Sequence, residues 1–363
     1  MIATGTFAEI KLPEQTQLLE YAVLDDKVII WVVTKDGLRS AENKIARSDL
    51  NQKIRNYLNA LSGNQRDGGA VTNQGKELYD VLIAPVAGYL NRNLQLCVIP
   101  DDDLNFLPFA SLVSPASGRY LIEDYVLETA PSATVFVTSS ASAKLRETTT
   151  QERLLVVGNP NFDREQFRDL PDLPAAKREA EEIAALYGAT PLVGKSAVLE
   201  RVTQSLKKSE VVHLATHAVP DESSPLLSKL LLSSDRTGDK AAHHASRGFL
   251  QASDIYDMKL PRTRLVVLSA CQTGIERSYR GEGAIGLARP FIAAGVPLVI
   301  ASLWPVESEA TAGLMISFHK HRKQDQVSTV EALRRAQLEA LHNPQSKTYD
   351  WAAFVAIGGY TGF

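Results

Sequence analysis

One cysteine and one histidine follow apolar, strand-like runs, and this pair of residue types can perform nucleophilic chemistry. Cys271 comes just after Leu265–Leu268, and His217 ends a run that starts at Val211. The carboxyl ends of parallel strands face the same crevice of an α/β sheet, so the two side chains are expected to lie together there. A thiol is mostly protonated at neutral pH, and a histidine partner supplies the thiolate. We therefore assign Cys271 as nucleophile and His217 as general base, or imidazolium partner, that later protonates the leaving group.

Backbone groups beside these residues can stabilise a developing oxyanion. The expected donors are the N–H of Cys271 and that of Ala218, directly after His217. Two such N–H groups suit a tetrahedral intermediate. The alternative for each side chain alone is structural: a small buried thiol and a polar residue that ends a strand.

Other residues that can bind metals or cofactors have simpler interpretations. His213 and His217 would lie about 13 Å apart on a strand, too far to share one zinc ion, so His213 is expected to be a core histidine with one hydrogen-bonded partner. Gly281–Glu282–Gly283 lacks the lysine and serine or threonine of a phosphate loop. The run Asp101–Asp103 has no spaced acidic partner and is expected to form a turn. No metal and no cofactor is predicted.

From residue 153 onward, strand and helix patterns alternate regularly. These strands and helices must position Cys271 and His217. This order predicts a parallel sheet with helices on its faces. The expected strands are 154–158, 189–193, 211–216, 265–268, 298–303 and 352–357. The expected helices are 175–187, a helix capped by Ser196 and ending at 206, 281–294, 307–323 and 328–341.

The first 150 residues have a different pattern. Two strands at 18–24 and 27–34 predict an antiparallel meander, and helices are expected at 49–61 and 73–90, the second with a kink at Pro85. A strand at 94–99 and a strand pair within 121–137 follow. The Ser/Ala/Thr-rich stretch 139–151 has no periodicity, so the predicted domains are 1–150 and 151–363.

Two polar stretches of the second domain have different expected roles. The insertion 218–262, which includes Asp221, interrupts the alternation next to the histidine strand and is expected to build a substrate groove or activation loop. The basic cluster 319–323 ends a helix and is expected to be a solvated last turn.

Composition excludes several classes of protein. The chain has 363 residues, 44% of them hydrophobic, with a net charge of −3 and both signs interspersed, so neither nucleic acid nor an anionic membrane is an expected partner. Two cysteines predict a reducing compartment, and the absence of a signal pattern or long apolar run predicts a cytoplasmic location. Cys97 lies inside an expected strand and is predicted to be a buried, inert thiol.

Several spaced motifs together resemble one family. HLATHA (213–218), LVVLSACQTG (265–274), GEGAIGLARPFIAAG (281–295) and SLWPV (302–306) are similar to the CHAT family, the caspase-like cysteine peptidases related to separase. The similarity extends through LPEQTQLLEYAV (12–23), IPDDDLNFLPFASL (99–112), APSATV (130–135) and WAAFVAIGG (351–359). Nearly the whole chain is covered, and the motifs keep one order.

The resemblance implies an α/β fold with a caspase-like, mostly parallel sheet flanked by helices, preceded by a non-catalytic, pseudo-caspase-like α/β domain. It implies a cysteine endopeptidase that acts on a protein substrate. Two other classes stay open: a catalytically silent scaffold, and a cysteine-dependent hydrolase or acyltransferase with a non-peptide substrate. CHAT modules are often joined to tetratricopeptide repeats, and no 34-residue helical repeat occurs here. A separate repeat protein or other sensor is therefore an expected partner.

The segment that contains Trp304 is expected to determine which substrate residue is recognised directly before the scissile bond. Separases have a similar segment, in which an acidic residue recognises the arginine of the substrate. In this sequence Pro305 stands at the position of that acid. The nearest carboxylates are Glu307 and Glu309, and Glu307 is within reach of that position. Alternatively, acidic residues in the first turn of a helix stabilise the helix dipole and need not contact any substrate. The sequence predicts a basic or unbranched residue before the cut, and no preference for aspartate.

Overall fold

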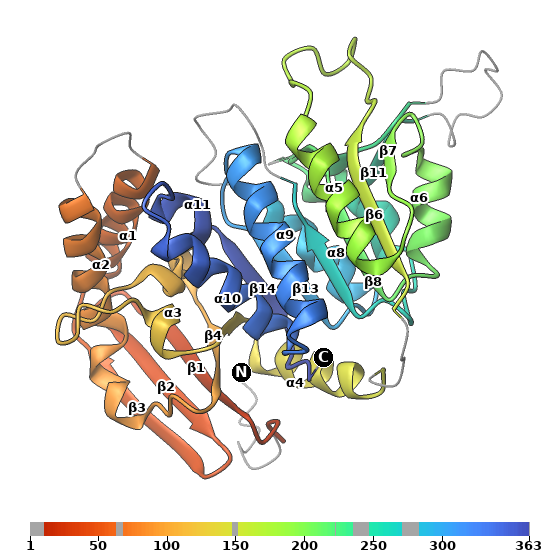
Figure 1. Ribbon diagram of the computed structural model, residues 1–363. Coiled ribbons are helices and arrows are strands. Elements are labelled where there is room, and N and C mark those ends of the chain that lie inside the picture. Colours follow the sequence, from red (N-terminus) through yellow and green to blue (C-terminus); the bar gives the residue numbers. More distant parts are fainter. Residues whose placement is uncertain are drawn as a thin grey trace. The chain divides into compact units, whose positions relative to one another are not determined.

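The computed structural model describes residues 11–62, 68–146, 152–221, 223–234, 247–270 and 283–362. The chain divides into two compact units (Figure 1). The first contains residues 1–141 and 358–360, and the second contains 142–357 and 361–363. Both are mixtures of helices and strands, so the expected α/β class is confirmed.

The first unit is built on a five-strand arrangement in the order β3-β2-β1-β4-β5. The meander predicted near the start is present as antiparallel β1, β2 and β3, while β4 and β5 continue parallel to β1. The strands are β1 (Thr16–Val23), β2 (Val28–Thr34), β3 (Gly37–Asn43), β4 (Gln95–Ile99) and β5 (Leu127–Thr129). The helices between them are α1 (Arg47–Ser62) and α2 (Gly68–Leu82), and Pro85 lies in a separate 3-10 turn, Ala84–Tyr89.

The predicted strand pair at 121–137 is wrong. Only β5 is a strand, preceded by the short helix α3 (Leu121–Asp124) and followed by α4 (Ala133–Lys144). Tertiary contacts select the helix: Phe136 is fully buried, and a Cβ at Gly359 would lie 2.3 Å from the backbone nitrogen of Ser140. The close approach of Gly359 to α4 is a tertiary contact, and the local sequence of 121–137 contains no signal of it.

The second unit has the sheet order β14-β13-β12-β8-β6-β7. The pairs β7–β6, β6–β8, β8–β12 and β12–β13 are all parallel, as the alternation predicted. The strands are β6 (Leu154–Pro160), β7 (Leu192–Gly194), β8 (Val211–Ala215), β12 (Leu265–Leu268), β13 (Leu298–Ser302) and β14 (Phe354–Gly358). The four residues of β12 and the five of β8 are all buried, which explains their continuous apolar runs.

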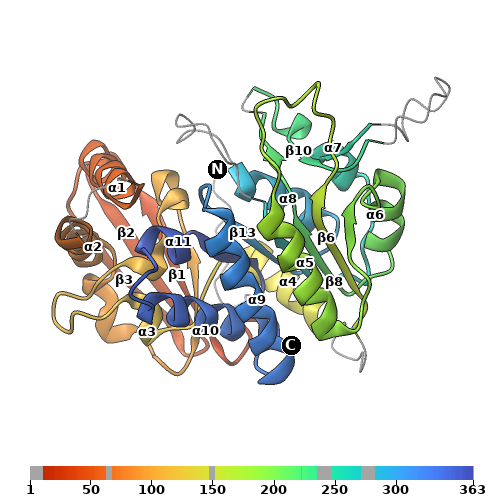
Figure 2. The same cartoon turned by 45° about the horizontal axis from the view of Figure 1, so that its top comes forward.

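Helices cover both faces of this sheet. Figures 1 and 2 show α5 (Pro174–Tyr187) and α9 (Ser308–Gln324) side by side on one face, and α8 (Gly283–Ala293) behind the sheet. The remaining helices are α6 (Leu199–Leu206), α7 (Ala252–Tyr256), α10 (Thr329–His342) and α11 (Thr348–Ala352). Within the described residues, no helix is long and apolar enough to cross a membrane.

The insertion after β8 forms a small sheet of its own. Its strands pair antiparallel in the order β11-β10-β9, with β9 (Ala218–Val219), β10 (Lys229–Leu231) and β11 (Phe249–Gln251). This sheet begins directly after His217, so the insertion starts at the candidate site.

Helix α5 lies unusually close to strand β6 because Gly158 has no side chain. A Cβ there would lie 2.5 Å from the carbonyl oxygen of Ala176 and 2.5 Å from the Cβ of Ala180. Larger residues at 158 would displace α5, together with every side chain that it directs toward the sheet.

Some local predictions in the second unit are wrong. Ser196 does not cap α6: its hydroxyl donates to the carbonyl of Val193, 2.7 Å away, and Val198 precedes the helix without a side-chain cap. Helix α11 was not predicted. The basic cluster of α9 is not uniformly solvated, because His319 is fully buried and Arg322 is 7% exposed. Both point inward because they bond to groups within the unit.

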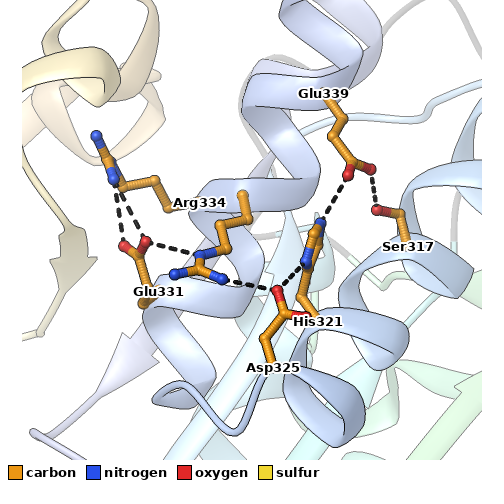
Figure 3. Close-up of polar contacts among 7 residues, drawn as sticks. Ser317, His321, Asp325, Glu331, Arg334 and Glu339 are labelled. Atoms are coloured by element: carbon orange, nitrogen blue, oxygen red, sulfur yellow. Dashed lines mark hydrogen bonds and ion pairs between the residues drawn. The ribbon is translucent and has the colours of Figure 1, made fainter.

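Helices α9 and α10 are joined by a network of charged side chains (Figure 3). His321 lies between two carboxylates, with Nδ1 2.7 Å from Asp325 and Nε2 2.8 Å from Glu339. Asp325 also accepts a hydrogen bond from Arg335, at 2.7 Å. His321 and Arg335 thereby link α9 and the residue that follows it to α10.

Candidate active site

The candidate site lies where strands β8 and β12 end. The strands are neighbours, and Leu268 lies opposite Leu214, a separation of 54 residues. His217 follows β8, and the buried residues Ser269 and Ala270 follow β12. Cys271 lies outside the described residues, as does its backbone N–H.

The orientation of the His217 ring is fixed by one hydrogen bond and one aromatic contact. Its Nε2 lies 2.8 Å from the carbonyl oxygen of Pro171. The ring meets that of Phe162 edge to face, with centroids 5.3 Å apart at 88°. A carbonyl can only accept, so Nε2 carries the hydrogen, and the neutral ring has its lone pair on Nδ1.

The Nδ1 atom of His217 is buried and has no hydrogen-bond partner among the described residues. Burial lowers the pKa of His217; the nearby Arg164 guanidinium acts in the same direction, and the Pro171 hydrogen bond opposes the shift. The imidazole is thus held neutral with a free proton acceptor at a defined atom. Such an atom suits a general base.

The backbone N–H of Ala218 points away from its neighbouring strand. The N–H of Leu231 donates to the carbonyl of His217 at 2.9 Å, and Ala218 lies opposite Leu230. In an antiparallel ladder this pattern makes Ala218 and Leu230 a non-hydrogen-bonded pair, so the N–H of Ala218 points away from β10. Strand β9 ends its sheet in the described part of the chain, so this N–H faces an unpaired edge.

A small cavity of about 20 Å³ lies beside the two strand ends. Thr216, directly after β8, and Ser269, directly after β12, line it together with Glu179 from α5 and Ser308 from the start of α9. The remaining lining residues are Leu173, Ala176, Val306 and Thr311. The Oγ of Ser269 is buried without a partner among the described residues. Two atoms that can form hydrogen bonds, this Oγ and His217 Nδ1, are therefore left unpaired near the same strand ends.

Sequence reasoning missed Glu179, although a signal was present. On α5 the buried residues include Ala176, Glu179, Ala180 and Ile183, so a carboxylate lies within the apolar stripe at helical spacing. Charged residues are rarely fully buried unless paired. Pro171, which orients His217, lies in an irregular loop and had no comparable signal.

The other predicted site residues do not line this cavity. The indole N–H of Trp304 donates to the carbonyl of Tyr349 at 3.0 Å, and the two rings stack. Glu307 is exposed, precedes α9, and does not line the cavity. Asp221 accepts hydrogen bonds from the hydroxyl of Ser223, at 2.8 Å, and from the N–H group of Ser224, at 2.9 Å, and these lower the pKa of its carboxyl.

Comparison with known proteins places this arrangement in a family. The model of the CHAT domain matches residues 72–359. The chain belongs to the CHAT domain family. The resemblance seen in the spaced motifs is thereby confirmed.

Relatives of this CHAT chain include tetratricopeptide repeat protein 28 from Mus musculus and from Homo sapiens. Each is 30% identical over 78% of the chain, which spans 13% of the length of either relative. Among solved structures, separase from Saccharomyces cerevisiae, in complex with securin, has a TM-score of 0.62 at 9% identity. The match covers 96% of this chain and 30% of the separase chain. At this identity the likeness concerns the fold alone, and it supports the predicted caspase-like architecture.

The remaining cysteine and histidine candidates of the CHAT chain are structural. Cys97 is fully buried in β4, and burial, with Glu128 nearby, raises the pKa of its thiol. His213 is fully buried, as predicted, but it has two hydrogen-bonded partners, Glu179 and His319. No group of three or more metal-ligating side chains is present in the described residues.

A larger hollow of about 460 Å³ lies over α5, α9 and α10. Charged side chains of both signs line it, including Arg178, His321, Asp325 and Glu339. These groups already pair with neighbours, as Figure 3 shows for the last three, and Arg178 pairs with Glu309. None of the described residues that line this hollow has a buried polar side-chain atom without a partner, unlike His217 and Ser269.

Proposed function

We propose that this CHAT chain is a cysteine endopeptidase that uses Cys271 and His217 as a catalytic dyad. The observation that carries the proposal is the ring of His217. Its Nε2–H is bonded to the Pro171 carbonyl, and its buried Nδ1 has no partner in the described part of the chain. A thiol is the partner that the CHAT motif supplies.

Register and covalent reach support the pairing. Cys271 follows His217 by 54 residues, the same separation that joins Leu268 to Leu214 across the two strands. Because Cys271 is only two residues after Ser269, their Cα atoms can be no more than about 7 Å apart. The thiol is thus restricted to the neighbourhood of the strand ends.

The reaction then follows from the two groups. The Cys271 thiol transfers its proton to Nδ1 of His217, and the thiolate attacks the scissile carbonyl carbon. The resulting oxyanion accepts hydrogen bonds from the backbone N–H groups of Ala218 and Cys271. As the C–N bond breaks, the imidazolium returns the proton to the leaving amine, and water hydrolyses the thioester.

Both mammalian relatives are named for tetratricopeptide repeats, so we further propose that a repeat protein acts as sensor or docking partner of this module. Full activity of the chain alone, unaltered by a co-purified repeat protein, would contradict this regulatory role.

The test is cleavage of unstructured polypeptides, read by mass spectrometry, for the wild type, Cys271→Ala and His217→Ala. Each variant is expected to lose at least about 1,000-fold in kcat/KM, and the double variant is expected to lose no more than either one. Far-UV circular dichroism checks that the fold persists. Near-full cleavage by either variant excludes the dyad. Turnover of a thioester or small ester without any peptide cleavage favours the non-peptide hydrolase instead.

A further inference from the structure

A line of five buried or nearly buried side chains runs through the second unit and joins α5, β8 and α9. Arg322 lies 3.0 Å from the hydroxyl of Tyr187, which lies 2.9 Å from Nδ1 of His319. Nε2 of His319 lies 3.1 Å from Nδ1 of His213, and Nε2 of His213 lies 2.7 Å from Glu179. Both histidines are fully buried, and Glu179 is 1% exposed.

The hydrogen bonds of this line point in one direction. A guanidinium only donates, so Tyr187 accepts from Arg322 and donates its own hydrogen to His319. Burial raises the pKa of Tyr187 and lowers that of His319, which keeps the phenol protonated and the imidazole neutral. His319 then donates from Nε2 to His213, and His213 donates from Nε2 to Glu179. The carboxylate of Glu179 is the final acceptor.

The charges at the two ends of this line are compensated differently. Arg322 forms an ion pair with Glu152, whereas the acceptor end is met by the imidazole of His213. Lysine and arginine are absent from the described lining of the cavity that Glu179 borders. Arg178 acts on Glu179 electrostatically, but it does not line the cavity, so the buried carboxylate makes the potential inside the cavity more negative.

The cavity matches a small cation in size and chemistry. Its volume of about 20 Å³ accommodates one water-sized group. Besides the carboxylate, the hydroxyl-bearing residues Thr216, Ser269, Ser308 and Thr311 line it. An ammonium is compact and has three donors, whereas a guanidinium is a planar fork that needs more room.

The cavity also has the right position relative to the dyad. Thr216 directly precedes His217, and Ser269 precedes Cys271 by two residues. Glu307, the acid first expected to read the substrate, is exposed and does not line it.

We propose that Glu179 determines the residue read before the scissile bond and that this residue is lysine, whose ammonium occupies the cavity. The inference rests on the proposed endopeptidase function and deepens it. The line of hydrogen bonds from Arg322 has a positioning role, because it holds Glu179 and leaves one side of the carboxylate toward the cavity.

The first test maps cleavage sites in a peptide library for the wild type and Glu179→Gln. Glutamine still accepts a hydrogen bond from His213 but removes the charge. The wild type is expected to cut after lysine about 10-fold better than after arginine, and Glu179→Gln is expected to lose roughly 100-fold on lysine substrates. Glu182→Gln, an exposed neighbour on α5, is the charge-matched control and keeps the preference.

Two further variants test the size of the cavity and the competing carboxylate of Glu307. Ser308→Val narrows the cavity without changing charge and is expected to weaken cleavage after lysine relative to alanine. Glu307→Gln tests the rival acid. Loss of the lysine preference in Glu307→Gln with retention in Glu179→Gln overturns the inference, as does a dominant aspartate before the cut.

A binding measurement separates this inference from the proposed peptidase activity. Calorimetry with n-butylammonium is performed on Cys271→Ala protein, with 1-pentanol as neutral probe and n-butylguanidinium as planar cation. Saturable binding of n-butylammonium is expected, at least about 10-fold weaker in Cys271→Ala/Glu179→Gln. Absence of binding, or equal binding by both proteins, overturns the site. Binding without any peptide cleavage supports the cation site and removes the endopeptidase proposal.

Discussion

At the scale of single residues, the candidate site depends on which ring nitrogen of His217 is free. The Pro171 carbonyl accepts from Nε2, and burial favours the neutral ring. Neither feature can be seen in the sequence, because Pro171 lies 46 residues before His217 in an irregular loop. Only the presence of a histidine at a strand end was predictable.

The tautomer of His217 is a testable consequence. In ¹⁵N-histidine-labelled Cys271→Ala protein, the ring is expected to be the Nε2–H tautomer at pH 7.5 and to titrate below 6.5, since burial disfavours the imidazolium. NMR nitrogen shifts report both properties, and the spectrum of His217→Gln assigns the signal. An Nδ1–H tautomer, or titration at or above pH 6.5, would contradict the assigned base.

His213 and His319 show where residue-level prediction from sequence ends. His213 was correctly placed in the core, because it lies within an apolar strand run. His319 was assigned to a solvated cluster, although its ring bonds Tyr187 and His213. The two histidines are 106 residues apart, and only packing of α9 on the sheet brings them together.

At the scale of elements, the periodicity of apolar residues predicted most helices and strands of the second unit. The helices bury one face and the central strands bury both, so each leaves a recognisable apolar pattern. Two failures, α4 at the boundary of the first unit and α11 in the second, have different causes. α4 contains Thr, Val and Ser residues that favour other structures locally, and its packing around Phe136 selects the helix. α11 spans only five residues, too few for a helical pattern.

Helix α9 is fixed to its unit by a buried ion pair. Nη1 of Arg322 donates to Glu152 at 2.7 Å, and Arg322 is 7% exposed. Burial would raise the pKa of Glu152, but the Arg322 guanidinium outweighs this and lowers it. The pair is therefore charged at neutral pH.

Removal of this guanidinium leaves the partly buried carboxylate of Glu152 with a more distant cation partner, Arg264, at 3.6 Å. Arg322→Ala is expected to lower the free energy of unfolding by about 3–5 kcal/mol, measured by urea denaturation at pH 7. Lys320→Ala, an exposed change on the same helix, is the control and should stay within about 0.5 kcal/mol of the wild type. A loss below about 1 kcal/mol in Arg322→Ala would show that the pair does not hold α9.

At the scale of the whole molecule, the two units contain buried titratable groups of opposite type. In the first unit, Glu128 is 2% exposed and neither of its carboxylate oxygens has a hydrogen-bond partner among the described residues. Burial raises its pKa to about 8, and the nearby Gln95 amide offsets only part of this effect. In the second unit, burial lowers the pKa of His319 well below its usual range, and the neighbouring His213 and Arg322 add to this.

These shifts predict opposite pH dependences for the two units. Folded Glu128 keeps its proton up to about pH 8, while the unfolded chain releases it near 4.3, so the first unit loses stability as pH rises between these values. Folded His319 stays neutral, while the unfolded chain binds a proton below about 6.5, so the second unit loses stability as pH falls. Each group contributes at most about 1.4 kcal/mol per pH unit.

Hydrogen exchange with mass spectrometry, corrected for intrinsic exchange rates, can follow each unit separately at pH 5.5, 7.0 and 8.5. Protection of β4 and β5 is expected to fall from pH 7.0 to 8.5, and Glu128→Gln should remove most of that change because glutamine does not titrate. Protection of β8 and α9 is expected to fall from pH 7.0 to 5.5, and His319→Gln should flatten that trend. Each variant serves as the control for the other, since a substitution in one unit should leave the pH profile of the other unit unchanged. Parallel pH profiles in the two units, or profiles that neither variant alters, would show that these buried groups do not govern the pH dependence of stability.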